Sequence, residues 1–383
     1  RVRRLRRQSL EAVPSISTER AVLMTEFYQE ETGMLSAPVR RAMAFRHLME
    51  HKSVCILDGE LIVGEKGPAP KATPTFPELC CHSLQDFDIL DSREKTPFTA
   101  GEAAKREQVE TVIPFWEGRS MRDLILAEMR PEWHAAYEAG VFTEFMEQRS
   151  PGHTVLDDKI YRKGMLDFIA DIDAALADLD YVEDPQAYAR QEQLKAMRIT
   201  AEAIITLGKR HAEEARRQAT AINDPVRKAE LEEIARVCDK VPASKPDSFH
   251  EALQYYWFVH LGVTCELNPW DAFNPGKLDQ HLFPYYQRET ADGTLTRAKA
   301  EELLHCFWIK FNNQPAPPKV GVTAAESGTY TDFAQINTGG VKPDGSDAVN
   351  EVTYLLLDVI EDMRLLQPSS SCQLSKKNPD RFM

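Results

Sequence analysis

No stretch of the sequence is apolar over the roughly 18 residues that a membrane-spanning helix requires. The basic start is followed by no apolar region, so we expect neither a membrane span nor a signal peptide. Basic residues are in deficit, because Lys and Arg number 46 against 60 Asp and Glu, and the net charge is −14. This balance predicts a soluble protein and disfavours nucleic acid or an anionic membrane as its main partner. We interpret the arginines at the start as a solvated helix face: Arg1, Arg3, Arg4, Arg6 and Arg7.

Cysteine is scarce, and its pattern argues against both disulfides and a metal. There are seven cysteines, an odd number, and no CxxC pair occurs. In a long chain this favours reduced thiols and a cytoplasmic location. Cys80, Cys81 and His82 are adjacent, but consecutive cysteines point apart and lack the spacing of zinc sites. We therefore interpret these cysteines as buried free thiols and expect no bound metal.

Several catalytic signatures are missing as well. The sequence contains no GxxxxGK[ST] phosphate loop, no GxGxxG after a strand, no GxSxG elbow, no HExxH and no kinase motif. Hydrolysis by a serine triad, zinc proteolysis and nicotinamide redox chemistry therefore have no support from motifs. These patterns alone indicate a soluble α/β domain with three polar loops.

Apolar periodicity predicts long helices separated by short strands. Helices are expected at residues 18–31, 39–51, 100–110, 120–129, 185–218, 225–240, 249–261, 297–311 and 346–365, and another begins near Leu278. Strands or hairpins are expected at 54–63, 262–267 and 370–375. Helix caps are expected at Ser17, Asp184-Pro185, Asp224-Pro225, Ser248, Thr296 and Ser346. Leu253, Trp257 and His260 share one helix face, which we interpret as core. The pattern predicts a helix-rich α/β protein and a single domain over residues 1–383.

Three polar segments interrupt this pattern. The longest, residues 311–340, has no helical or alternating period, and Pro315, Pro317 and Pro318 remove backbone donors from its first part. Such a segment either belongs to a functional site or forms a surface loop, and composition leaves both open.

The other two polar segments each contain a titratable candidate. His153 follows the break at Pro151-Gly152, where an acid/base side chain can be aimed into a cavity; alternatively it is a structural histidine held by backbone carbonyls. Asp271 lies in a sharp turn within residues 268–277. Its alternative role is the N-cap of the helix that begins near Leu278.

Long motifs in and around these segments resemble the glycyl radical enzymes, the pyruvate formate-lyase-like superfamily. They are ERAVLMTEFY (19–28), GELIVGEKG (59–67), FPELCCHSLQDFD (76–88), FTEFMEQRSPGHT (142–154), ELNPWDAFNPGKLDQHL (266–282) and NNQPAPPKVGVTAAESGTYTDF (312–333). The resemblance covers nearly the entire chain. It implies a ten-stranded barrel made of two five-stranded parallel halves surrounded by helices, and this chain would form the N-terminal part of it.

The resemblance also implies a radical chemistry. In this family an S-adenosylmethionine-dependent activating enzyme installs a protein glycyl radical, which generates a cysteine thiyl radical inside the barrel. The thiyl takes a hydrogen atom from the substrate, whose radical then expels a leaving group, and enclosure protects the intermediates. Nothing here matches the family's GCVE or RVxG-type motifs. Both radical carriers are therefore expected outside this chain, which by itself should be inactive.

Within the family, the motifs are most similar to enzymes that eliminate water from trans-4-hydroxy-L-proline to give 1-pyrroline-5-carboxylate. This substrate carries an ammonium, a carboxylate and a hydroxyl, so it needs an anionic partner, hydrogen-bond donors and an apolar clamp. By motif position the resemblance implies two catalytic residues, His153 and Asp271. Asp271 would bind the ammonium or orient His153, and the pair would aid proton transfer to the departing hydroxyl.

The same motif positions imply four substrate-binding residues. Ser327 would contact the carboxylate, while Phe145 and Phe333 would hold the ring and exclude water. Arg149 is a further candidate for a carboxylate or sulfonate contact.

Other functions stay open on the sequence. One is carbon–sulfur cleavage of a small sulfonate such as isethionate, with Arg149 as the anion contact, and another is a glycyl radical diol dehydratase. A choline lyase is disfavoured, because His153 is potentially cationic beside a quaternary ammonium. A hypothesis of a different class is a non-catalytic partner or scaffold that retains only the barrel wall. A homodimer is expected because the family usually forms one.

Overall fold

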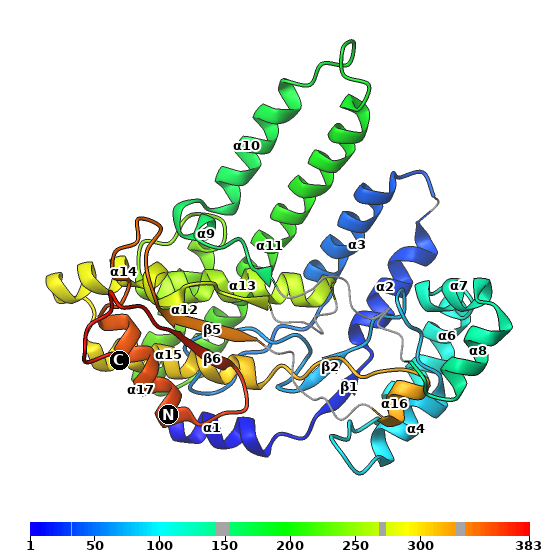
Figure 1. Cartoon of the computed structure of the whole chain (residues 1–383), viewed down its shortest axis with the longest axis horizontal. Coiled ribbons are helices and arrows are strands. Elements are labelled where there is room, and N and C mark those ends of the chain that lie inside the picture. Colours follow the sequence, from blue (N-terminus) through cyan, green and yellow to red (C-terminus); the bar gives the residue numbers. More distant parts are fainter. Residues whose placement is uncertain (32, 143–152, 268–272, 327–333) are drawn as a thin grey trace.

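The computed structural model describes residues 1–31, 33–142, 153–267, 273–326 and 334–383. Helices dominate this part of the chain and the strands are short (Figure 1), which confirms the prediction of a helix-rich α/β protein. The helices are α1 (Val2–Glu11), α2 (Glu19–Glu30), α3 (Ala37–His51), α4 (Leu84–Ser92), α5 (Glu102–Glu107), the π-helical turn η1 (Gln108–Val112), α6 (Ile113–Trp116), α7 (Met121–Glu128), α8 (Pro131–Glu138), α9 (Lys159–Arg162), α10 (Met165–Ala177), α11 (Ala187–Ala221), α12 (Pro225–Lys240), α13 (Phe249–Glu266), α14 (Leu278–Asp292), α15 (Arg297–Asn312), α16 (Val322–Glu326) and α17 (Glu351–Met363).

Each strand of the described residues pairs in parallel with one other. The strands are β1 (Ser15–Ser17), β2 (Ala72–Pro74), β3 (His153–Thr154), β4 (Phe273–Asn274), β5 (Gln335–Gly339) and β6 (Ser369–Gln373). β1 pairs with β2, β3 with β4, and β5 with β6. One isolated parallel bridge, between Lys277 just after β4 and Asn337 of β5, links the β3–β4 sheet to the β5–β6 sheet. We call β3, β4, β5 and β6, linked in this way, the parallel row. The closed ten-stranded barrel stays an expectation, because the described strands form three two-stranded parallel sheets.

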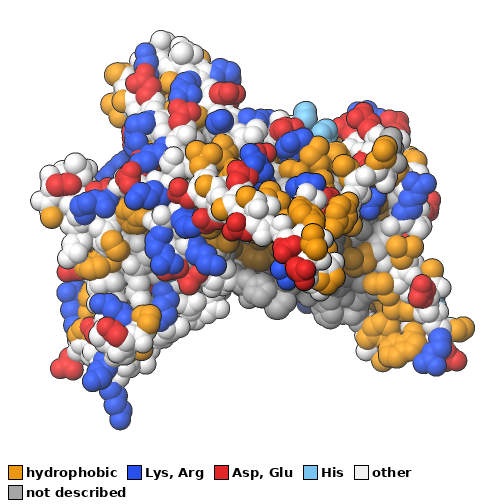
Figure 2. Space-filling model, turned by 90° about the horizontal axis from the view of Figure 1, so that it is seen from above, with side chains coloured by type: hydrophobic (Ala, Val, Ile, Leu, Met, Phe, Trp, Pro, Cys, Tyr) orange, Lys and Arg blue, Asp and Glu red, His pale blue; other side chains and the backbone are white. Residues whose placement is uncertain are grey.

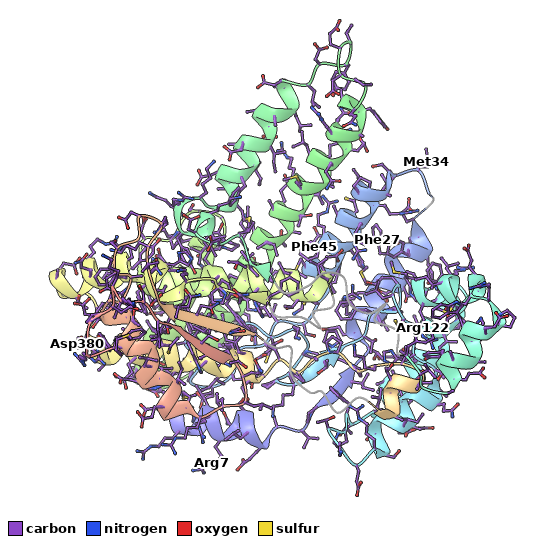
Figure 3. All side chains as sticks on the ribbon, in the orientation of Figure 1. Arg7, Phe27, Met34, Phe45, Arg122 and Asp380 are labelled. Carbon is purple, nitrogen blue, oxygen red and sulfur yellow. The ribbon has the colours of Figure 1, made fainter. Side chains whose placement is uncertain are left out.

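The hydrophobic core surrounds α13, most of whose side chains are buried. The predicted stripe of Leu253, Trp257 and His260 has no exposed surface, which confirms that it is core. Phe45 of α3, labelled in Figure 3, belongs to the same cluster of buried residues. Gly262 allows α13 to approach α11 closely, because a Cβ at this position would overlap the Ile204 side chain.

α10 and the first half of α11 project from the body as an antiparallel pair (Figure 1). α10 was not predicted. Gly164 precedes it, with its N–H donating 2.8 Å to Asp167 Oδ2, and the backbone N–H of Met165 donates to the Pro242 carbonyl. The pair lies beside α3, against which α11 also packs.

The predicted strand at 54–63 is wrong, and its backbone groups explain why. They bond to side chains instead of to a neighbouring strand: Val63 N–H donates to Gln254 Oε1 at 2.9 Å, and Trp257 Nε1 donates to the Gly64 carbonyl at 2.9 Å. A buried irregular segment satisfied in this way needs no strand partner.

The predicted strand at 262–267 is also wrong, because α13 continues through it to Glu266. α11 begins at Ala187 rather than at Pro185, and α17 begins at Glu351 rather than near Ser346. In α17 the N-cap is Asn350, whose side chain accepts from the Val352 and Thr353 N–H groups. α2 likewise begins after Thr18, because Ser17 belongs to β1.

Three of the predicted helix caps and the position of the last strand are confirmed. The side chains of Asp224, Ser248 and Thr296 accept backbone hydrogen bonds at the start of α12, α13 and α15. The last strand, β6, overlaps the predicted 370–375.

The arginines at the start are not simply a solvated face. Arg1 pairs with Glu230 and Glu302, Arg4 pairs with Asp58, and Arg6 donates to the Met363 carbonyl. Arg7 extends outward from α1 in Figure 3. The helix is therefore tied to the body by part of its basic face.

The surface seen in Figure 2 carries acidic and basic side chains interspersed over most of this face. Within the described residues, every helix is too short or too polar to cross a bilayer. All seven cysteines are free thiols.

Candidate functional site

The row of parallel strands brings together three segments that are distant in sequence. β3 pairs with β4 through His153 and Phe273, and β4 lies beside β5 through the Lys277–Asn337 bridge. In parallel strands the amino ends lie at the same edge of the sheet. The first residues of β3, β4 and β5, each of which follows one of the polar segments in the sequence, therefore lie toward one edge.

The predicted site residues belong to these three segments. His153 is the first residue of β3 and contributes its backbone to the pairing with Phe273. The others lie outside the described residues: Phe145, Arg149, Asp271, Ser327 and Phe333. The roles of all six stay predictions. Lys277 occupies the N-cap position of α14, the place that the alternative interpretation gave to Asp271.

The residues that follow β3 are held in place by α14 and by further pairing with β4. Val155 N–H donates to the Asn274 carbonyl at 3.0 Å and extends the pairing with β4. Beyond it, Asp157 Oδ1 lies 3.0 Å from His281 Nε2, and the imidazole of His281 stacks on Tyr161 at 5.0 Å between ring centroids. α14 thus holds the chain that leaves β3.

The chain that leaves α13 is fixed by two arginines. Arg20 Nε donates to the Cys265 carbonyl at 2.6 Å, and its guanidinium pairs with Glu78 at 2.6 Å. Arg41 of α3 pairs with Glu266, the last residue of α13. Burial raises the pKa of Glu266 in spite of Arg41, whereas for Glu78 burial is outweighed by Arg20, so the pKa of Glu78 is lowered. The last turn of α13 is therefore anchored before the 268–272 segment.

The segment before residue 327 is fixed by side chains from α4, α7 and α8. Gly321 N–H donates to Asp86 Oδ1 at 2.8 Å, and Val322 N–H donates to the hydroxyl of Tyr137 at 3.2 Å. Arg122, labelled in Figure 3, donates to the same hydroxyl at 2.8 Å. On the other side of the segment, the Ala334 carbonyl accepts from the Ser369 N–H, next to the pairing of β5 with β6.

A buried charge cluster lies behind the third segment. Lys310 Nζ donates to Glu60 Oε1 at 2.6 Å and to Glu65 Oε1 at 2.7 Å, and none of the three side chains is more than 3% exposed. Asn313 and Gln314 also donate to Glu65, at 2.9 and 2.6 Å. Burial alone would lower the pKa of Lys310, but the two carboxylates raise it above its ordinary value. The ammonium is therefore charged and holds residues 60–65 against the end of α15.

This cluster shows that the first part of the 311–340 segment is not a surface loop. Residues 311–320 are all buried, and Lys66 Nζ donates to the Pro315 carbonyl at 3.2 Å. Proline carbonyls and amide side chains are thus bonded to the GELIVGEKG motif. Sequence reasoning missed the contact between Lys310 and Glu60 because the two residues are 250 positions apart. The available signals were Glu60 and Glu65 inside the GELIVGEKG motif and Lys310, two positions before the motif that begins at Asn312.

Cys80 and His82 pack against the same proline segment, whereas Cys81 packs against the cluster of Ala21, Val112 and Trp116. His82 Nε2 lies 3.2 Å from the Pro318 carbonyl oxygen, and Cys80 is in a small apolar cluster with Val320. Burial raises the pKa of the Cys81 thiol to about 12. The three side chains therefore have the contacts of a packed interior.

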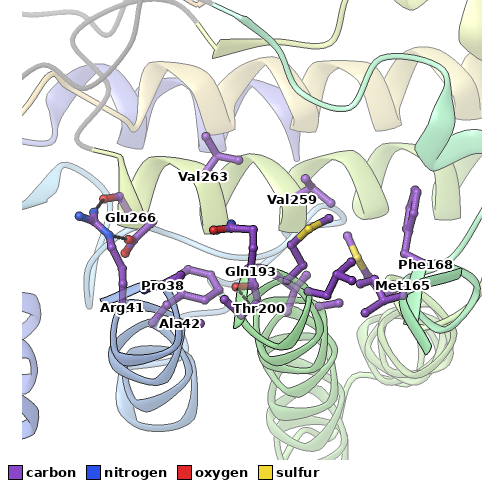
Figure 4. A pocket seen from close by; sticks show the side chains of 18 of the residues that line it. Pro38, Arg41, Ala42, Met165, Phe168, Gln193, Thr200, Val259, Val263 and Glu266 are labelled. Atoms are coloured by element: carbon purple, nitrogen blue, oxygen red, sulfur yellow. Dashed lines mark hydrogen bonds and ion pairs between the residues drawn. The ribbon is translucent and has the colours of Figure 1, made fainter. Parts of the chain in front are cut away.

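An apolar cavity of about 860 Å³ lies between α3, α10, α11 and α13 (Figure 4). Its lining includes Ala42, Met165, Phe168 and Val259, and the Arg41–Glu266 pair forms one polar end. Among the described residues, its lining includes none from β3, β4 or β5. A small zwitterion would find few polar partners here.

Comparisons with known proteins agree with this architecture. Over 383 residues the chain is 55% identical to trans-4-hydroxy-L-proline dehydratase of Clostridioides difficile, which covers 100% of this chain and 48% of that protein. It is 31% identical over 389 residues to isethionate sulfite-lyase of Oleidesulfovibrio alaskensis, covering 97% of this chain and 46% of that one. The chain spans about half the length of the curated relatives it matches.

Solved structures give the same result. A crystal structure of hydroxyproline dehydratase from Clostridioides difficile, with trans-4-hydroxy-L-proline bound, superposes with a TM-score of 0.95 at 55% identity, over 100% of this chain and 48% of that chain. The glycerol-bound B12-independent glycerol dehydratase from Clostridium butyricum gives 0.91 at 33% identity, again over 100% and 48%. The sequence profile described as pyruvate formate lyase-like matches residues 1–383. The chain therefore belongs to the pyruvate formate lyase-like family.

Proposed function

We propose that this chain is part of a glycyl radical dehydratase that eliminates water from trans-4-hydroxy-L-proline and gives 1-pyrroline-5-carboxylate. The observation that carries the proposal is the 55% identity over all 383 residues to an enzyme named for this reaction. The parallel row supports it, because β3, β4 and β5, which follow the three segments with the predicted site residues, begin toward one edge.

In this proposal the six predicted residues line one chamber. Asp271 meets the ring ammonium or orients His153, and His153 delivers a proton to the departing hydroxyl. Ser327 contacts the carboxylate, with Arg149 as a further anion contact. Phe145 and Phe333 hold the ring and exclude water.

The scaffold of described residues supports such a chamber by holding each segment at its ends. Asp157–His281, Arg41–Glu266 and Asp86–Gly321 are contacts of this kind, one beside each segment. Preorganised segments cost less to order when substrate binds.

Abstraction of a hydrogen atom from the substrate is the chemistry that the glycyl radical and its thiyl partner would supply. The cysteines of this chain fit the thiyl role poorly. Cys238, Cys265 and Cys306 are buried in the helical core, and Cys372 is within β6, opposite Thr338. We expect both radical carriers, and the activating enzyme that installs the spin, to lie outside this chain, with a homodimer as the working assembly in the cytoplasm.

The test is an anaerobic assay of the full-length gene product after activation, with the glycyl radical verified by electron paramagnetic resonance. Hydroxyproline, isethionate, glycerol and choline are offered separately. We expect 1-pyrroline-5-carboxylate from hydroxyproline and no comparable turnover of the other three.

Two outcomes would contradict the proposal. Sulfite release from isethionate would favour the carbon–sulfur lyase instead, the activity named for the relative at 31% identity. A stable radical with no turnover of any of the four substrates would favour a non-catalytic scaffold or another substrate.

A further inference from the structure

Three side chains that could bind a metal ion meet between α15 and α17. Glu301 and His305 are one helical turn apart on α15 and therefore lie on the same face. Asp362 comes from the last turn of α17, which packs against α15. One ligand atom from each residue lies within 4.8 Å of the others. The proposed site of the hydroxyproline reaction uses none of these residues.

The imidazole of His305 has a nitrogen without a hydrogen-bond partner. His305 is only 8% exposed, and its Nε2 atom is buried with no hydrogen-bond partner. The atom is 3.6 Å from Asp362 Oδ2, which is beyond hydrogen-bond distance. Buried polar atoms are nearly always paired, so this unpaired nitrogen beside the Asp362 carboxylate points to a missing partner in the cluster.

The local charges favour a cation in that place. Among the described residues, no Lys or Arg pairs with Glu301 or Asp362. The neighbouring cations Arg1 and Lys299 are instead bound to Glu302. Two carboxylates are thus left beside a buried imidazole.

The position is also accessible to an ion from solvent. The side chain of Asp362 is 60% exposed. Glu301 and His305 line a cavity of about 600 Å³ at the surface, together with Glu302 and Lys299. Water could therefore complete the coordination of an ion held by three protein ligands.

We propose that Glu301, His305 and Asp362 bind one divalent transition-metal ion, for which Zn²⁺ is the best match. Zn²⁺ accepts one imidazole nitrogen and carboxylate oxygens at about 2.0–2.2 Å, and three protein ligands with one water make a common geometry. An imidazole ligand disfavours Mg²⁺ and Ca²⁺, which prefer oxygen alone. Small side-chain rotations would close the 4.8 Å spread around such an ion.

The ion would clamp α17 to α15. α15 continues into Lys310 and Asn313, which hold residues 60–65 behind the third polar segment. The proposed metal therefore has a structural role, bracing the helix that carries the buried charge cluster.

The experiment is a calorimetric titration in which ZnCl₂ is added to the full-length protein. A chelator first removes any bound metal ions from the protein. Asp362→Asn removes one ligand from an exposed position, and His305→Gln removes the imidazole. Asp358→Asn is the matched control: it lies one turn earlier on α17, is similarly exposed and pairs with Arg297 outside the cluster. Circular dichroism checks the fold of each variant, and binding of Co²⁺ followed by visible absorption gives a second readout.

We expect wild type and Asp358→Asn to bind Zn²⁺ alike at this site. Asp362→Asn and His305→Gln should each weaken that binding by more than about tenfold, since even loss of a residue behind a ligand costs 10–100-fold. Absence of stoichiometric zinc binding by the folded wild type would overturn the proposal, as would an equal loss in Asp358→Asn and Asp362→Asn. Tighter binding of Mg²⁺ than of Zn²⁺ would overturn the assigned class of metal.

Discussion

At Lys310 one buried ammonium bonds to two buried carboxyl groups, and burial raises the pKa of Glu60 in spite of Lys310. Glu60 and Glu65 are as inaccessible as the lysine, and Glu65 is further satisfied by Asn313 and Gln314. Each charge would be strongly unfavourable alone in this place, and together they lock the start of the third polar segment to the GELIVGEKG motif.

Lys310→Met should therefore be strongly destabilising. It leaves two carboxyl groups in the interior without their cationic partner, and the free energy of unfolding should fall by about 3–5 kcal/mol. Denaturant titration followed by circular dichroism measures the loss. Lys105→Met is the control, because Lys105 pairs with the exposed Asp88, and its stability should stay close to wild type. A similar stability for both variants would contradict this role of the cluster.

Glu78 should make stability depend on acid pH. Burial by itself would raise its pKa, but Arg20 outweighs burial and lowers the pKa below its ordinary 4.5. A carboxyl with a lowered folded-state pKa stabilises the protein above its unfolded pKa and loses this contribution as pH falls through the folded pKa.

Glu78→Gln should thus lower the free energy of unfolding by about 3 kcal/mol at pH 7. The difference from wild type should shrink once the pH is well below 4.5. Urea titrations of both proteins at a series of pH values measure it, with the exposed Glu132→Gln as the control. A difference that is constant with pH would refute the lowered pKa.

At the scale of elements, the position of α10 depends on a glycine. Gly164 is the N-cap of α10, and a Cβ there would overlap backbone atoms of Ala243 and Ser244. Backbone cannot move aside as a flexible side-chain end can, so the segment after α12 and the start of α10 would have to separate.

Gly164→Ala is expected to destabilise the protein by about 1–3 kcal/mol through this overlap. Gly101→Ala is matched to it, because Gly101 is also a helix N-cap, at α5, with open space around its Cβ position. That variant should lose about 1 kcal/mol or less. Thermal unfolding of the two proteins compares them directly, and an equal loss would assign the effect to capping rather than to packing.

Elements also show what local sequence reasoning can and cannot provide. The caps of α12, α13 and α15 follow from short-range chemistry, and they were predicted. The strand expected at 54–63 failed because its backbone donors and acceptors found Gln254 and Trp257, residues that no local pattern connects to it. The β-branched residues near 262–267 favour strands locally, yet burial against α11 keeps them in α13.

At the scale of the whole molecule, the parallel row decides which distant segments become neighbours. β3, β4 and β5 join residues near 153, 273 and 335, and each follows one of the polar segments found in the sequence. The roles of His153 and Asp271 are predictions built on this arrangement and on the family resemblance.

His153→Gln in the activated full-length enzyme should lower kcat for hydroxyproline dehydration by about 10²–10⁴-fold while the fold survives, because it removes the proposed proton donor. His51→Gln should leave kcat unchanged, since His51 is an exposed residue at the end of α3. Steady-state assays and circular dichroism test both variants. Unchanged turnover in His153→Gln would refute the catalytic role.

The sequence by itself determined the helix-rich α/β class, many helix ends, the buried stripe of α13 and the family, because these depend on local periodicity, caps and long contiguous motifs. Only the tertiary structure decided that Lys310 meets Glu60 and Glu65, that residues 311–320 are interior, and that β3, β4 and β5 are neighbours. The physical reason is that contacts between residues hundreds of positions apart depend on which charges are buried together and on how the strands pair. Neither produces a periodic pattern in the sequence.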